Sequence, residues 1–166
     1  MTINNSDIKT IESTAEEFLN KMTVQFLAVK AKAGATDANP KEPAEEPREV
    51  VDLYIKLEEP QILIGQGGQT LFEIQRLLRT VLNKKLQKVF YLNLDINDYK
   101  AKKVEYLKDL AKSLADEVAL TKEEKALPPM SSYERRVVHA ELSGRTDIIA
   151  ESHGEGMDRH IVIQPK

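Results

Sequence analysis

The chain has 166 residues and carries 24 Lys and Arg against 27 Asp and Glu, which gives a formal net charge of −3. It contains no cysteine, which excludes a disulfide scaffold, thiolate metal ligands and a cysteine nucleophile. No apolar run approaches the roughly 18–20 residues of a membrane span, and residues 1–6 lack the pattern of a signal peptide. The composition therefore predicts a soluble cytoplasmic protein, and its acidic balance taken alone argues against a nucleic-acid partner.

Periodic apolar residues in the first 96 positions predict a small domain of two helices and three strands. Helical spacing covers 7–22 and 71–82, and alternation of apolar with polar residues predicts strands over 24–28, 51–57 and 90–96. A short apolar run at 62–64 ends in a glycine-rich loop at 65–68. Residues 31–48 contain three prolines and no large apolar side chain, so they predict a disordered acidic loop between the first two strands.

Residues 97–166 predict a second small domain. Asn97 is expected to cap a helix whose apolar stripe covers 104–118. Ser131 and Glu134 have the spacing of a capping box, in which each side chain satisfies a backbone N–H at the start of the next helix. That helix is expected to end near Gly144 in a left-handed cap, and two strands are expected at 146–151 and 160–164.

The negative charge is unevenly distributed along the chain. Residues 1–60 carry a net charge of −5, whereas the remaining 106 residues carry +2 and the stretch 72–103 alone carries +5. A charged run most often forms a solvated face, so the basic stretch bears on function only if it surrounds a binding loop.

The glycine loop has the spacing Gly65-x-x-Gly68. A P-loop requires a Lys that is absent here, and a dinucleotide fingerprint requires a third Gly where Thr70 stands. The remaining interpretation is the KH arrangement, in which such a loop clamps the backbone of about four nucleotides. Glycines let a phosphodiester approach the main chain, and the N–H groups that open the following helix attract it. The alternative is a tight structural turn.

Arg135 and His139 lie four residues apart and therefore on one face of the capped helix. Arg offers a planar fork to phosphate, and His can donate to phosphate or stack on a base. The alternative is a surface Arg and a His satisfied by nearby backbone. The three histidines have no recognised metal-ligand spacing, and neither a Gly-x-Ser-x-Gly elbow nor a carboxylate pair marks a catalytic site. The sequence therefore predicts no enzyme, no cofactor and no metal.

The two motifs together resemble the bacterial Jag (KhpB-like) family. Residues 63–71 (LIGQGGQTL) are similar to the KH loop of that family, and residues 133–139 (YERRVVH) to its single-strand-binding module named for Arg-x-x-x-His, the R-three-H domain. Residues 152–155 (SHGE) and 159–165 (RHIVIQP) are similar to the terminal strands of that module. The resemblance implies an α+β protein of two small domains, a type II KH-like domain at 1–96 and an R-three-H domain at 97–166.

The resemblance also implies a single-stranded RNA-binding protein linked to cell elongation, division or envelope control, often with a small KH-domain partner. Single-stranded DNA is a second candidate ligand. Three departures from the family stand out: the N-terminal Jag domain is expected to be absent, Gln66-Gly67 replaces the usual Lys or Arg, and the 31–48 insert is long and acidic. The alternative function is a protein-interaction adaptor associated with a membrane-protein insertase or the small KH partner. The residues expected to contact nucleic acid are Gly65, Gln66, Gly67, Gly68, Arg76, Arg79, Arg135, Arg136, His139 and Arg159.

Overall fold

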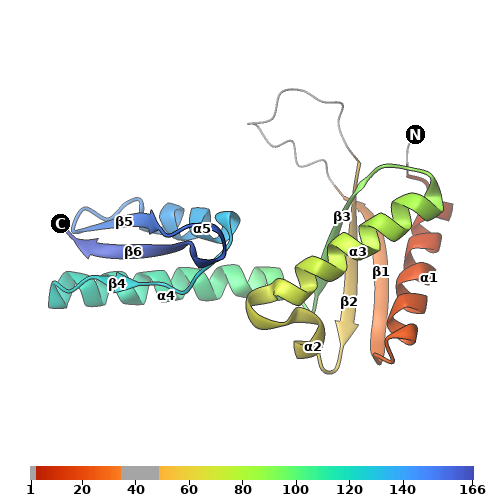
Figure 1. Ribbon diagram of the computed structural model, residues 1–166, viewed down its shortest axis with the longest axis horizontal. Helices are drawn as coiled ribbons and strands as arrows, with labels where there is room; N and C mark the ends of the chain where they lie inside the picture. Colours follow the sequence, from red (N-terminus) through yellow and green to blue (C-terminus); the bar gives the residue numbers. More distant parts are fainter. Residues whose placement is uncertain (1–2, 35–48) are drawn as a thin grey trace. The chain divides into compact units, whose positions relative to one another are not determined.

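The computed structural model describes residues 3–34 and 49–166, which divide into two compact units, Met1–Tyr99 and Lys100–Lys166 (Figure 1). Each unit combines helices with a small sheet, so the predicted α+β class is confirmed. Residues 35–48 of the predicted acidic loop lie outside the described part of the chain. Within that part, no helix has both the length and the apolar character needed to cross a bilayer.

The first unit contains a three-stranded sheet in the order β1-β2-β3, with β1 antiparallel to β2 and β2 parallel to β3. Helices α1 and α3 pack on one face of this sheet, and the apolar side chains of that face form a single core with them (Figure 1). The elements are α1 (Asn5–Lys21), β1 (Phe26–Gly34), β2 (Val50–Leu57), α2 (Gln61–Ile64), the 3-10 turn η1 (Gln66–Gly68), α3 (Gln69–Leu86) and β3 (Tyr91–Ile96).

Strand β1 differs from its prediction at both ends. It begins at Phe26 rather than at position 24, and it continues to Gly34, so residues 31–34 are strand although the sequence placed them in the loop. Small residues suffice there because the backbone pairs with β2, with Ala31 opposite Leu53. The Glu12 carboxylate of α1 also accepts the Ala31 N–H at 2.8 Å. Pairing with a neighbouring strand therefore overrides a composition that predicts a loop.

Asn97 has a role that the sequence does not reveal. Its side chain accepts the Leu57 N–H at 2.9 Å and donates to the Leu57 carbonyl at 2.8 Å, so it closes the end of β2. Its φ of 51° lies in the left-handed region, which Asn tolerates better than most residues. The turn at Asn97 and Asp98 leads directly into the next helix.

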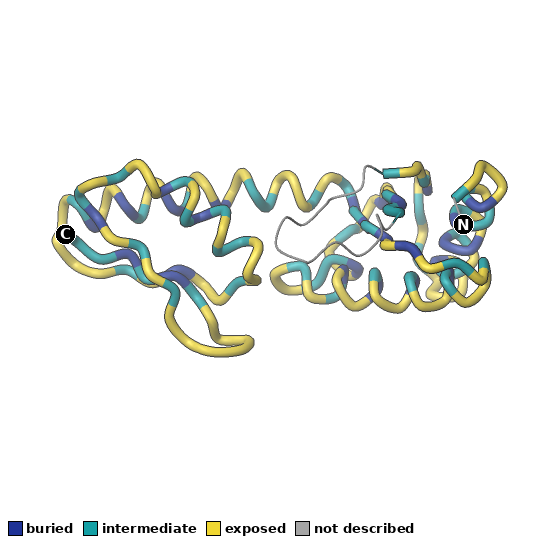
Figure 2. Tube along the Cα trace, turned by 90° about the horizontal axis from the view of Figure 1, so that it is seen from above, coloured by how far each residue is buried: buried dark blue, intermediate teal, exposed yellow. Residues whose placement is uncertain are grey.

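The second unit packs two helices on an antiparallel sheet of order β4-β6-β5. Buried positions recur along its helices and strands between exposed ones, as expected for elements with one face in a core (Figure 2). The elements are α4 (Tyr99–Thr121), β4 (Lys125–Ala126), α5 (Ser132–Leu142), β5 (Ile148–His153), the 3-10 turn η2 (Gly156–Asp158) and β6 (His160–Pro165).

The capping box at the start of α5 and the approximate position of its end follow the prediction, but the type of cap at its end does not. Glu134 Oε2 accepts the Ser131 N–H at 2.7 Å, and Ser131 Oγ accepts the Glu134 N–H at 3.3 Å, so the capping box is confirmed. The left-handed cap at Gly144 is wrong, because α5 ends at Leu142 with Ser143 in right-handed geometry and Gly144 has no positive φ. A hydrogen bond of 3.0 Å from the Arg145 N–H to the Leu142 carbonyl closes the turn instead.

Candidate nucleic-acid interface

The glycine loop joins α2 to α3 through three glycines with positive φ. Gly65, Gly67 and Gly68 have φ of 70°, 62° and 91°, and a hydrogen bond of 3.3 Å from the Gly68 N–H to the Gly65 carbonyl closes the turn. A side chain at Gly65 would overlap the Thr70 hydroxyl, and a Cβ at Gly68 would lie 2.9 Å from a ring carbon of Tyr99. The two outer glycines are therefore required by the packing of the loop itself.

The middle of the loop is open. Gln66 and Gly67 are exposed, and a Cβ at Gly67 would meet no atom within 4 Å. A phosphodiester can therefore reach the backbone of this pair. Because neither residue is a cation, the loop itself supplies backbone groups without a counter-charge.

Arg76 and Arg79 lie on α3, where they line a shallow hollow of about 320 Å³. The Arg76 guanidinium is 3.4 Å from the Glu73 carboxylate and 6.0 Å from the centre of the Phe72 ring. Arg79 lies 5.7 Å from the centre of the Tyr91 ring. Exposed ion pairs of this kind are worth little, so a phosphate can compete with Glu73 for Arg76.

The basic stretch at 72–103 does not form one basic patch. Lys88 Nζ lies 2.6 Å from the Asp7 carboxylate, a largely buried pair that lowers the pKa of Asp7. Lys85 donates to the Thr14 hydroxyl at 2.9 Å, and Lys103 lies 3.9 Å from Glu134. These three cations are engaged within their own units, so the local charge of +5 overstates what a ligand meets.

Arg135 is held by the backbone of the segment that precedes α5. Its Nη1 donates to the Met130 carbonyl at 2.7 Å, and the Met130 N–H donates to the Arg159 carbonyl at 3.1 Å. This chain of hydrogen bonds places the first motif residue beside the start of β6, where Arg159 stands. Since a guanidinium has five N–H donors, Arg135 retains donors for a phosphate.

His139 connects α5 to β5. Its Nε2 lies 3.1 Å from the Ser152 hydroxyl, and Nδ1 meets no partner among the residues that the structure describes. The ring is half-buried. His139 therefore has a hydrogen-bond partner within the protein, as the alternative interpretation of the sequence expects, but the partner is a side chain and not backbone. Nδ1 remains able to donate to a ligand.

Arg136 and Arg159 are exposed, and neither forms an ion pair with any described residue. Tyr133 precedes Arg136 by three residues and is 62% exposed, so both lie on the outer face of α5. Sequence reasoning did not assign Tyr133 to the site, although an aromatic residue three positions before an exposed Arg is a usable signal. The outer face of α5 therefore presents an exposed ring and an exposed cation three residues apart.

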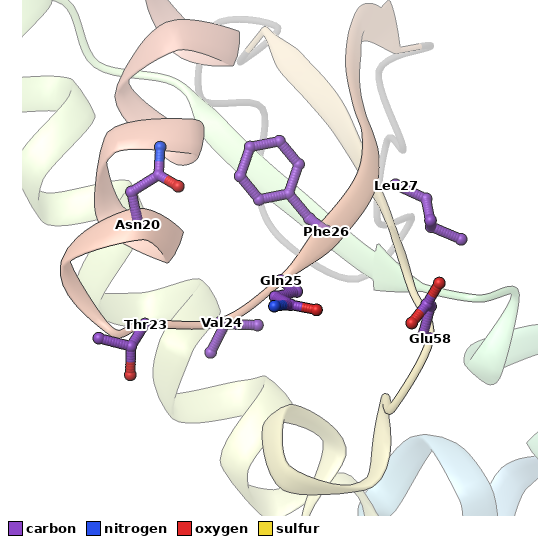
Figure 3. A pocket seen from close by; sticks show the side chains of 7 residues that line it. All are labelled: Asn20, Thr23, Val24, Gln25, Phe26, Leu27 and Glu58. Carbon is purple, nitrogen blue, oxygen red and sulfur yellow. The ribbon is translucent and has the colours of Figure 1, made fainter.

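A larger hollow lies elsewhere in the first unit, between the end of α1 and the start of β1. Its volume is about 520 Å³, and among the described residues that line it only Glu58 is charged (Figure 3). None of the expected contact residues lines it, and a carboxylate opposes phosphate binding. Nor do residues 3–34 and 49–166 include a cluster of three or more His, Asp or Glu arranged to hold a metal ion.

Comparisons with known proteins identify the family. Residues 105–165 match the R-three-H domain family. The RNA-binding protein KhpB of Bacillus subtilis is 36% identical over 148 residues, which cover 88% of this chain and 69% of that protein. KhpB of Clostridium symbiosum is 37% identical over 116 residues, 70% of this chain, and KhpB of Streptococcus pneumoniae serotype 2 is 29% identical over 116 residues. The match spans about half the length of the Clostridium protein (52%) and about a third of the Streptococcus protein (35%). Identity of this level over most of the Bacillus protein shows that the chain belongs to the KhpB family.

Proposed function

We propose that this chain binds single-stranded RNA through two small domains, a type II KH-like domain at 1–96 and an R-three-H domain at 97–166. The observation that carries the proposal is the outer face of α5, where Arg136 and Tyr133 are exposed beside the anchored Arg135 and His139. This face lies in the segment that matches the R-three-H family. The relatives are named RNA-binding proteins, which supports the same ligand class.

The R-three-H domain contacts phosphates and a base in this proposal. Arg136 and Arg159 pair with phosphates, because both are exposed and carry no competing carboxylate among the described residues. Arg135 and His139 contribute their remaining N–H groups, held in place by Met130 and Ser152. Tyr133 stacks on a base, an interaction that accepts any base because every base has a π-face.

The KH-like domain holds the backbone of a short single strand. Gly65, Gln66, Gly67 and Gly68 present backbone N–H groups at the start of α3, and Arg76 and Arg79 supply charge further along that helix. Because the loop lacks a cation, its share of the affinity is smaller than that of the α5 face. Linking two weak sites in one chain raises the affinity through effective concentration.

Fluorescence anisotropy with short RNA and DNA single strands at several salt concentrations tests this function. Binding is expected to weaken steeply with salt, with a slope of about 0.7 per phosphate contacted on a single strand. Arg136→Ala is expected to weaken binding by about five-fold, whereas Lys9→Ala, an exposed control on α1, leaves it unchanged. Absence of binding at low salt contradicts the proposal.

A protein-interaction adaptor is the second candidate function. The uncharged Gln66-Gly67 pair and the net charge of −3 favour it, because both reduce the attraction of an RNA backbone. In that case the KH-like domain serves a small KH-domain partner or a membrane-protein insertase. If the chain is an adaptor, a variant with both Arg135→Ala and His139→Ala still captures its protein partner in a pull-down. A pull-down that recovers mainly RNA, which nuclease treatment removes, contradicts the adaptor function.

The family resemblance extends the proposal to the cell. It supports a cytoplasmic, post-transcriptional regulator of elongation, division or envelope synthesis. No metal, cofactor or catalytic step forms part of this function.

A further inference from the structure

The sheet of the first unit has a second face that α1 and α3 do not cover. Strand alternation sends Val29, Leu53 and Ile55 into the core and their neighbours to the opposite side. On β1 and β2 those neighbours include Lys30, Lys32, Tyr54 and Lys56, and all four are exposed. We call these four residues the tyrosine platform.

Tyr54 stands among the three lysines of the platform. Lys30 is its direct cross-strand partner on β1, and Lys56 follows it two positions later on the same face of β2. Lys32 Nζ lies 5.0 Å from the centre of the Tyr54 ring, within cation–π range. Tyr54 is 38% exposed and is therefore accessible from this side of the sheet.

Three lysines and two acids share this face of the sheet among the described residues. None of the three lysines forms an ion pair with a residue that the structure describes, so their charges are available to a ligand. The acids on the same face are Asp52, which accepts the Asn93 side-chain N–H at 2.8 Å, and Asp95, which pairs in register with Tyr54 from β3. Asp52 lies on β2 opposite Lys32 and Asp95 lies on β3, so the positive charge of this face is concentrated at Lys30 and Lys56, on the two sides of Tyr54.

We infer that the tyrosine platform is a second contact surface for a single-stranded nucleic acid, and this rests on the proposed function. One base stacks on Tyr54 and displaces the Lys32 ammonium toward a flanking phosphate, while Lys30 and Lys56 contact the phosphates on either side. An exposed ring within a cluster of cations matches the alternation of base and phosphate in a single strand. The platform is separate from the glycine loop, which leads into α3 on the covered face.

The test combines photo-crosslinking with affinity measurements on the full chain. A 4-thiouridine oligonucleotide is crosslinked and the modified peptides are identified by mass spectrometry. Tyr54→Ala is expected to weaken binding of a long oligonucleotide about five-fold or more and to remove a crosslink in β2, while Tyr54→Phe retains both. The double change Lys30→Gln with Lys56→Gln is expected to lower the salt slope by about 0.7 per lysine. Lys9→Gln with Lys21→Gln removes the same charge from α1 and is the matched control.

Each outcome separates the platform from the proposed function. In one outcome, Arg136→Ala weakens binding, no platform variant has an effect, and no crosslink is found in β2. This outcome overturns the platform and leaves the proposed function standing. Absence of binding by the unmodified chain overturns both. Competition at the platform by poly-glutamate as strong as that by RNA identifies an acidic-peptide site and overturns the inference. A variant whose melting curve equals that of the unmodified chain is folded. If Tyr54→Ala unfolds, the Lys30→Gln with Lys56→Gln variant tests the platform in its place.

Discussion

The Arg135 guanidinium donates to the Met130 carbonyl at 2.7 Å, so the first cation of the Arg-x-x-x-His motif is tied to the segment that leads into its own helix. Its neighbour Arg136 is exposed and has no such contact among the described residues. Two adjacent arginines of one motif thus have different structural surroundings. Arg135 is therefore part of the local structure as well as a proposed contact for RNA, whereas Arg136 has only the proposed contact.

Substitution of the two arginines is expected to separate stability from binding. Arg135→Ala removes a charge-assisted hydrogen bond and is expected to lower the free energy of unfolding by about 1.5 kcal/mol, in addition to weakening RNA binding. Arg136→Ala is expected to change the free energy of unfolding by less than about 0.5 kcal/mol while weakening RNA binding by a similar factor. Urea unfolding followed by circular dichroism, together with anisotropy, measures both. Equal destabilisation by the two variants contradicts this assignment.

A cation placed in the glycine loop is expected to tighten RNA binding. Gln66→Lys adds a charge at an exposed position, and a gain of a few-fold that disappears at high salt is expected. Gln66→Asp is expected to weaken binding, because it sets a carboxylate beside a phosphate. Gln25→Lys adds the same charge at an exposed site outside the loop and serves as the control. If Gln25→Lys changes the affinity by the same factor, the effect comes from net charge and not from the loop.

The two glycines that differ in their surroundings are expected to differ in their tolerance of a side chain. Gly67→Ala carries only the cost of a left-handed conformation, about 1 kcal/mol, because its Cβ meets open space. Gly65→Ala carries a larger backbone cost, because φ 70° with ψ −177° is a conformation that essentially only Gly adopts, and it adds a clash with the Thr70 hydroxyl, so it is expected to lower the melting temperature by more. Thermal unfolding of both variants provides the comparison, and equal shifts in melting temperature would contradict the expected difference.

Acid is expected to weaken the second unit through Asp147. The Arg145 guanidinium donates to both carboxylate oxygens of Asp147, at 2.8 and 2.7 Å, and lowers its pKa from 3.8 to about 2. The folded carboxyl then binds fewer protons than the unfolded one, so this contribution is complete above about pH 4 and is lost as the pH falls toward 2. Unfolding measured from pH 5 to pH 2 is expected to show a shallower loss in Asp147→Asn than in the unmodified chain. Parallel pH profiles for the two chains contradict this role.

Local sequence signals predicted most of the helices and the start of α5. Apolar residues at helical spacing identified α1 and α3, and Ser131 with Glu134 identified the capping box, because each of these features depends on residues a few positions apart. The position of the glycine loop before α3 was predicted for the same reason. The proposed roles of the loop and of the Arg-x-x-x-His motif remain predictions for the experiments above.

The rest depended on residues that are distant in the chain. Pairing with β2 made residues 31–34 a strand, and Asp7 neutralised a cation, Lys88, that lies 81 positions later. The tyrosine platform likewise depends on the register between β1 and β2, which pairs Lys30 with Tyr54. The sequence by itself determined the helices, the capping box of α5 and the motifs, since short-range periodicity and hydrogen bonding set them. Only the tertiary structure decided which charges remain free for a ligand, because contacts between distant segments determine that.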